Sequence, residues 1–263
     1  MPLIRLALLV VTTLGLCAIT CSATLAANNP FVRVDQDGNV YYGQVLGSAS
    51  GSKFVSTCSH DTVRIEADAQ VQNSSRQCLD LSRFTGASLG PPPPSAPVAA
   101  ATARPSAVLV SDPIAIVHYD GSGKPLAASS GLVSGVAGAR GQVVGDIAGA
   151  LSMRLGVSVA WDPASGTQTA TLDRLCNAQH LVGVLVAATP RLELFDTGTG
   201  PRIANAYITL RGYRCTDRVF EDVGALAEGT RDPTPGGWSD DEGTAAFKKL
   251  VTALRRQLIA LVS

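Results

Sequence analysis

Four consecutive prolines, Pro91 to Pro94, divide the chain and limit what it can fold into. Consecutive prolines adopt the polyproline II conformation and lack the amide hydrogens that a strand ladder needs. The surrounding residues 86–105 are rich in proline and alanine, so we expect a semi-rigid linker there; a proline-rich ligand for another protein is the alternative. The linker leaves two folding parts, residues 29–85 and residues 106–263.

Residues 1–27 have the three parts of a secretory signal peptide. Arg5 gives a basic start, residues 6–18 form an apolar run too short to span a bilayer, and small residues follow. We expect cleavage after Ala26 or Ala27 and localisation in the periplasm or outside the cell.

Two cysteines in this leader, Cys17 and Cys21, open the alternative of lipid attachment. A lipidation signal generally has Leu, a small residue, and Gly or Ala before the cysteine. Leu16 precedes Cys17 and Thr20 precedes Cys21, so neither fits well. Soluble export is favoured, and membrane contact is expected only if the chain is lipidated.

The mature chain keeps four cysteines: Cys58, Cys78, Cys176 and Cys215. An even number in an oxidising compartment favours disulfides. Because the linker separates the first two from the last two, we predict the bonds Cys58–Cys78 and Cys176–Cys215. Each would stabilise the fold by ~3 to 4 kcal/mol in the chain-entropy model. A zinc site is the alternative, but it needs close CxxC or CxxH pairs, which these cysteines lack.

The charge balance argues against a polyanionic partner. Lys+Arg and Asp+Glu number 21 each, so no net field attracts nucleic acid or anionic lipid. Aromatic residues make up 5 % of the chain, which leaves few side chains on which bases or sugars could stack. We expect no nucleic-acid partner.

Residues 29–85 are predicted to form a small all-β module. Strand-like patterns occur at residues 31–34, 40–45 and 62–67. The Asp-Gly and Gly-Asn steps between Asp35 and Asn39 suit a tight hairpin. Asp35, Asp37 and Asn39 also resemble the start of a calcium loop, but Leu46 stands where its glutamate would be, so the turn is favoured.

Residues 106–263 mix strands and helices, which predicts an α/β (α+β) C-terminal domain. We expect strands at residues 107–110, 114–119, 157–161, 181–187, 191–196 and 204–211, and helices at residues 140–155 and 173–178. A turn at residues 197–200 joins the last two strands. After a loop rich in Gly and Pro, Ser239 and Glu242 form a capping box for a final helix. Its apolar face consists of Phe247, Leu250, Val251, Leu254, Leu258 and Leu261.

The basic residues of this final helix, Lys248, Lys249, Arg255 and Arg256, mostly lie off its apolar face. They could mark an anionic partner, but a solvated surface is the favoured interpretation. The glycines at 141, 145 and 149 have GxxxG spacing. Because charged residues interrupt that segment, we expect a helix packed closely on a sheet rather than a membrane span.

Each candidate catalytic motif lacks residues that its chemistry requires. Gly121-Ser-Gly-Lys124 lacks the other residues of a phosphate-binding loop. Ser50-Gly-Ser-Lys53 matches the S-x-x-K of penicillin-recognising enzymes, but their S-D-N and K-T-G elements are absent from the sequence. His60, His118 and His180 are isolated in the sequence, so we expect them to be structural histidines. We therefore predict no catalytic, cofactor-binding or metal-binding residues and no cofactor.

The element order of the second part resembles the periplasmic α/β domains of the TolB amino-terminal and CsgG-like group. The residues that carry the resemblance are 172–186, a helix leading into an apolar strand, and 190–200, a hairpin strand ending in Thr197-Gly-Thr-Gly200. The group's usual Val-Leu-Pro-Phe first strand is replaced by Val108-Leu-Val-Ser-Asp-Pro113. The resemblance covers about 120 residues between 106 and 263. It implies a non-catalytic envelope scaffold that docks partners, and it carries over no functional residues.

The sequence thus predicts an exported, non-enzymatic cell-envelope accessory or binding protein, with residues 106–263 as a docking domain. Its partner would be another envelope protein. Two alternatives remain open: an outer-membrane-associated assembly component of lipoprotein type, and a hydrolase with an unrecognised site.

Overall fold

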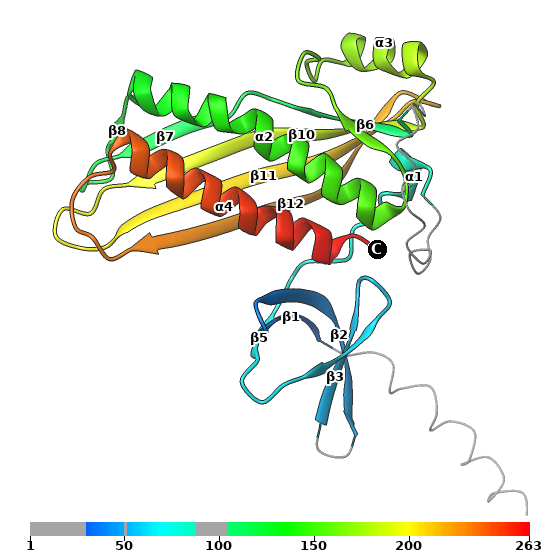
Figure 1. Ribbon diagram of the computed structural model, residues 1–263, viewed down its shortest axis with the longest axis horizontal. Coiled ribbons are helices and arrows are strands. Elements are labelled where there is room, and N and C mark those ends of the chain that lie inside the picture. Colours follow the sequence, from blue (N-terminus) through cyan, green and yellow to red (C-terminus); the bar gives the residue numbers. More distant parts are fainter. Residues whose placement is uncertain (1–29, 50–51, 88–104) are drawn as a thin grey trace, which may run out of the picture.

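The computed structural model describes residues 30–49, 52–87 and 105–263, and it shows a mixed α/β protein with two separate β-sheets (Figure 1). The predicted signal peptide, Cys17, Cys21 and residues 88–104 of the predicted linker lie outside the described residues.

The N-terminal region is β-rich, as predicted. Its five strands are antiparallel in the order β4-β3-β2-β1-β5. They are β1 (Phe31–Gln36), β2 (Asn39–Ala49), β3 (Ser52–Thr57), β4 (Thr62–Ile65) and β5 (Gln70–Asn73). The hairpin between β1 and β2 turns at Asp37 and Gly38, whose φ angles of 53° and 72° are those of the predicted tight turn. We name this sheet, residues 31–73, the small sheet.

The second sheet has seven strands, with the main order β12-β11-β10-β6-β9 and with β7 paired to both β10 and β8. Its strands are β6 (Ala107–Ser111), β7 (Ala115–Tyr119), β8 (Pro125–Leu126), β9 (Val159–Trp161), β10 (Gly183–Phe195), β11 (Arg202–Arg214) and β12 (Val219–Asp232). Strands β6, β7 and β9 join by parallel pairing, whereas β10, β11 and β12 form an antiparallel meander. We name it the large sheet.

Two long helices, α2 (Ser130–Leu155) and α4 (Asp240–Leu261), lie side by side on one face of the large sheet (Figure 1). They pack against inward-facing side chains such as Leu185 and Leu192. The shorter α3 (Thr169–Gln179) packs against Val184 and Tyr213, whose side chains point to the opposite face. The large sheet is therefore covered along its length on one face and only near one end on the other.

Helix α2 begins ten residues before the expected position, because Ser129 caps it by accepting a hydrogen bond from the Leu132 amide at 3.0 Å. The early glycines of α2 allow close packing on α4 rather than on the sheet: a β-carbon at Gly135 would overlap Thr244. In the described part of the chain, every helix is either too short or too polar to cross a bilayer.

Two further differences concern strands. The segments expected at residues 181–187 and 191–196 are one strand, β10, with an irregularity between Ala188 and Arg191. Strand β12 fills most of the region expected as a loop rich in Gly and Pro before the last helix. The turn at residues 197–200 and the hairpin that it joins are confirmed.

The predicted capping box of α4 is confirmed, and a buried arginine extends it. The Ser239 amide donates to Glu242 at 3.0 Å, and Arg202 donates two hydrogen bonds to the same carboxylate at 2.8 and 2.9 Å. Arg202 is only 2 % exposed, and it also pairs with Asp232 at 2.9 Å. These bonds tie the first turn of α4 to the end of the large sheet.

Acid should weaken this junction. The hydrogen bonds from Arg202, followed by those from Ser239, lower the pKa of Glu242 to about 2. Because the folded pKa is depressed, the carboxylate stabilises the fold above its unfolded pKa of about 4.3, and that contribution is lost as the pH falls towards 2. We expect Glu242→Gln to be less stable than wild type in urea at pH 7, and the difference to narrow steadily as the pH falls from 4.5 towards 2. The exposed neighbour variant Asp241→Asn is the control, and a constant gap between wild type and Glu242→Gln would contradict the prediction.

Candidate functional site

The small sheet is held against helix α4 and strand β12 by a network centred on Gln257. This side chain is 1 % exposed and donates hydrogen bonds to the Tyr42 hydroxyl at 3.1 Å and to Glu228 at 2.9 Å. Glu228 also accepts from Arg33 at 3.2 Å, and the Gln257 oxygen accepts from Arg76 at 2.8 Å. A buried amide with both ends bonded fixes the two sheets relative to one another, because each lost partner would leave a desolvated polar group.

The chain between the two sheets follows the large one. Leu79 pairs with Val262 in a parallel bridge: its amide donates to the Leu261 carbonyl at 2.8 Å, and its carbonyl accepts from the Ser263 amide at 3.1 Å. A few residues on, α1 (Ser82–Thr85) places Phe84 over Gly212 in the main core. Residues 29–85 were expected to form the β module, but the end of this segment, from Leu79 to Thr85, packs on the large sheet.

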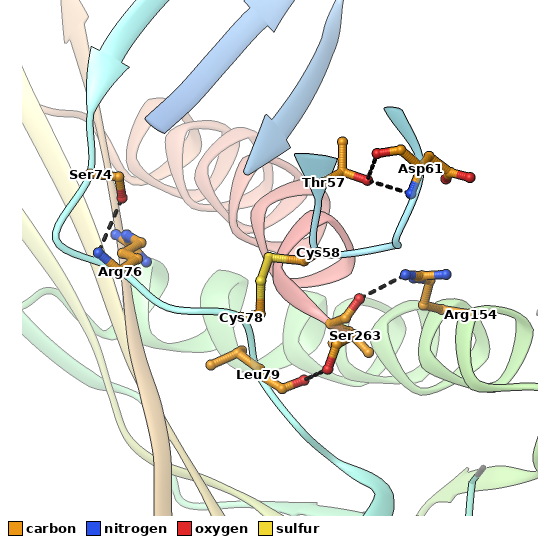
Figure 2. Close-up of a disulfide and its surroundings, with 10 residues drawn as sticks. Thr57, Cys58, Asp61, Ser74, Arg76, Cys78, Leu79, Arg154 and Ser263 are labelled. Carbon is orange, nitrogen blue, oxygen red and sulfur yellow. Dashed lines mark hydrogen bonds between the residues drawn. A yellow bond between two sulfur atoms is a disulfide. The ribbon is translucent and has the colours of Figure 1, made fainter. Parts of the chain in front are cut away.

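Each of the two disulfides joins two cysteines on the same side of the predicted linker, which is the pairing that the position of the linker favours. Cys58 bonds to Cys78 and Cys176 bonds to Cys215. Figure 2 shows Cys58 at the end of the small sheet and Cys78 next to Leu79, so the first disulfide joins the small sheet to the segment that packs on the large one. The second holds α3 to the end of β11.

A groove of about 580 Å³ opens beside this junction, between the small sheet and the C-terminal halves of α2 and α4. Three arginines line it, Arg154 from α2 and Arg255 and Arg256 from α4, and no carboxylate is among its lining residues. Its other walls are Asn39, Val40, Tyr41, Thr57, Ser59, Ala150, Met153, Thr252, Ile259 and Ala260. We name it the junction groove.

The junction groove combines positive charge with apolar surface. Arg154 donates to the Val262 carbonyl at 2.8 Å, which fixes its side chain beside the C-terminal end of α4 (Figure 2). Arg255 is half-buried and Arg256 is exposed, and neither forms an ion pair with a residue that the structure describes. Met153 is 72 % exposed and adds apolar surface to the groove. Such a surface suits a partner segment that carries both acidic and apolar side chains.

A second groove of about 360 Å³ lies on the β1 side of the same contact and is polar with both signs of charge. Its lining includes Asp35, Asp37, Asp68 and Glu228 together with Arg33 and Arg256. Within the described ranges, no set of three or more His, Cys, Asp or Glu side chains is arranged to hold a metal ion.

The three histidines lie far apart. His118 Nε2 is 2.8 Å from Asp196 Oδ1, and that carboxylate oxygen also accepts from the Trp238 amide at 3.0 Å. His60 lies in a turn with a φ of 65°, and His180 ends α3 with a φ of 53°. None of them is hydrogen-bonded to a hydroxyl or thiol of a described residue. Through Asp196, these contacts link β7 and the end of β10 to Trp238 in the loop before α4.

Sequence patterns pointed to some of these residues but not to their grouping. Arg255 and Arg256 belong to the basic stripe that was expected to be solvated, and Arg255 is instead half-buried in the junction groove. Lys248 and Lys249 are exposed as expected. Arg154 comes from another helix, more than 100 residues away in the chain, and no local pattern could place it beside them.

No protein-family model matches the chain, and neither does any curated protein. The solved structures to which it is similar include three bacterial ones. A PelC dodecamer from Paraburkholderia phytofirmans is 14 % identical, and the match covers 62 % of this chain and 92 % of that one with a TM-score of 0.27. Protein XCC0632 from Xanthomonas campestris is 11 % identical, with 61 % and 86 % of the two chains covered and a TM-score of 0.29. A putative neuraminyllactose-binding hemagglutinin homolog from Helicobacter pylori is 8 % identical, with 64 % and 84 % of the two chains covered and a TM-score of 0.29. Similarities of this size carry no inference about function.

Proposed function

We propose that the protein is an exported, non-enzymatic binding protein of the cell envelope, and that its junction groove docks an acidic and apolar segment of another envelope protein. The observation that carries the proposal is the composition of this groove between the small sheet and helices α2 and α4: three arginines, no carboxylate, the exposed Met153 and the half-buried Val40, Tyr41 and Ile259.

Rigidity of the groove walls supports the proposal. The Gln257 network, the Leu79–Val262 bridge and the Cys58–Cys78 disulfide all fix the small sheet beside α4. A groove with fixed walls binds a partner at a lower entropic cost than a groove that must first assemble. Such fixed placement of two units is what a docking scaffold needs, and a scaffold role of the kind implied by the resemblance to the TolB amino-terminal and CsgG-like group is part of this proposal.

Export is supported by the cysteines. Four of the six cysteines are paired, and disulfides persist in oxidising compartments outside the cytosol. The predicted leader at residues 1–27 agrees with such a compartment.

A site-specific crosslinking experiment tests the groove. A photoreactive residue replaces Met153, and crosslinks are collected in the intact envelope of the native host. We expect one discrete adduct with another envelope protein, reduced at least fivefold by Arg255→Glu with Arg256→Glu, because reversed charge repels an acidic partner.

The matched control carries Arg174→Glu, which changes an exposed arginine on α3 away from the groove. It should leave the adduct unchanged. Absence of any adduct at position 153, or an equal loss in the Arg174→Glu control, would show that the junction groove is not a docking site.

A further inference from the structure

Strand β12 forms one edge of the large sheet, and part of that edge is already occupied by a side chain. Arg76 donates hydrogen bonds to the carbonyl oxygens of Ala225 at 3.0 Å and Ala227 at 3.5 Å. These two carbonyls therefore point away from β11 and towards the open edge. The guanidinium takes the place of a neighbouring strand there, as edge protection requires.

The protected stretch ends at Ala227, whereas the strand runs on to Asp232. Backbone groups alternate in direction along an antiparallel strand, so the N–H and C=O of Gly229 and Arg231 point outward, as those of Ala225 and Ala227 do. Among the residues that the structure describes, none is hydrogen-bonded to these groups. The edge at residues 228–232 can thus accept another strand.

A groove of about 380 Å³ runs beside this open edge, between the end of β12 and the first half of α4. Its walls include Pro233, Trp238, Ala245 and Ala246, and Lys249 lies at its rim. The side chain of Leu226 points into the core, so those of Thr230 and Asp232 share its face, and that of Arg231 faces the other way. A strand added to this edge would place alternate side chains in the groove and beside Arg231.

The free charges at this edge are positive. Asp232 and Glu242 are both engaged by Arg202. Arg231 and Lys249 are exposed and form no ion pair within the described ranges. We propose that the β12 edge at residues 228–232 binds an extended peptide segment of a partner protein by strand addition, with apolar side chains in the groove alternating with acidic side chains beside Arg231.

The same charges disfavour a second copy of this chain as the occupant. Two β12 edges paired antiparallel about this short stretch would bring the two copies of Arg231 close together, and like charges opposite one another across a strand pair are destabilising. This edge lies at the opposite half of α4 from the junction groove, so it is a separate surface, and the inference does not depend on the proposed function.

Amide hydrogen exchange on the full mature chain with its disulfides intact tests the proposal. The probe is the synthetic peptide acetyl-Val-Asp-Val-Asp-Val-Asp-Val-amide. At saturation, exchange of the Gly229 and Arg231 amides should slow at least tenfold, while the amides of the β4 edge, at the far side of the small sheet, should not change.

Two comparisons make the result specific to strand addition. A peptide of the same sequence with N-methyl groups on alternate amides keeps the side chains but loses the backbone donors, and it should bind at least tenfold more weakly. Arg231→Glu with Lys249→Glu should weaken binding of the parent peptide by a similar factor, whereas Lys248→Glu on the adjoining exposed position should not.

Three outcomes would overturn the proposal: no binding of the parent peptide, equal binding of the N-methylated peptide, or slow exchange at Gly229 and Arg231 that depends on protein concentration without peptide. The last would mean that a second copy occupies the edge. The variant Arg255→Glu should bind the peptide as wild type does, so failure at this edge and failure of the junction groove are distinguishable.

Discussion

Replacing Phe84 with alanine should lower the free energy of unfolding by about 3 to 5 kcal/mol, the usual cost of removing a fully buried phenylalanine. Phe84 is 2 % exposed and packs in the main core against Gly212 of β11. Urea unfolding at pH 7 measures the change. The variant Phe54→Ala, at a half-buried position of the small sheet, should cost clearly less.

The glycine beneath Phe84 supplies a sharper check. A β-carbon at Gly212 would overlap the Phe84 ring, so Gly212→Ala should destabilise the wild type. In the Phe84→Ala background the space is free, and the same substitution should cost little. Additive effects of the two substitutions would contradict the packing described, because residues in contact are expected to show coupling in a double-mutant cycle.

The second large effect is expected from removing the Cys58–Cys78 disulfide by substituting both cysteines with serine. The bond closes a loop of 20 residues, which corresponds to about 3 kcal/mol of stability in the chain-entropy model. Because it also joins the two sheets, its loss should allow the small sheet to open separately. We expect amide exchange in β1 to β3 to accelerate more than exchange in β10 and β11.

The matched control replaces Cys176 and Cys215, whose loop spans 39 residues. This variant should lose about 4 kcal/mol in the same chain-entropy model, yet keep the difference in exchange between the two sheets as in wild type. If the Cys58→Ser, Cys78→Ser variant exchanges faster to the same extent in both sheets, the first disulfide does not act as the link between them.

Local sequence patterns were sufficient for much of the fold, and they failed where tertiary contacts decide. The β1–β2 hairpin follows from its Asp-Gly turn, and the α4 start follows from Ser239 and Glu242. The first turns of α2 were missed because Gly131, Gly135 and Gly138 are poor helix formers. At Gly131 and Gly135 close packing on α4 requires the absence of a side chain, because a β-carbon there would overlap Asp240 and Thr244.

Strand β12 was missed for a related reason. The alternation of polar and apolar residues along β12 is broken at a register shift opposite Leu210 and Arg211. Small residues such as Gly224 and Gly229 weaken this alternation further. Pairing with the long strand β11 overrides this weak local preference.

The candidate sites were the least predictable features. The junction groove needs Arg154, Arg255 and Tyr41 from three elements, and the Gln257 network joins residues up to 215 positions apart. No periodicity reports such contacts, because periodicity describes a single element at a time.

The long-range character of the Gln257 network has a consequence for the order in which the protein can assemble during its synthesis. Tyr42 must wait for a partner that emerges 215 residues later, and Leu79 for one near residue 262. During that interval the first five strands have only their own small core of Val32, Val34 and Val55. Cys58 and Cys78 can already meet at this stage, before Cys176 emerges, so early oxidation would guard the nascent chain against mispaired thiols.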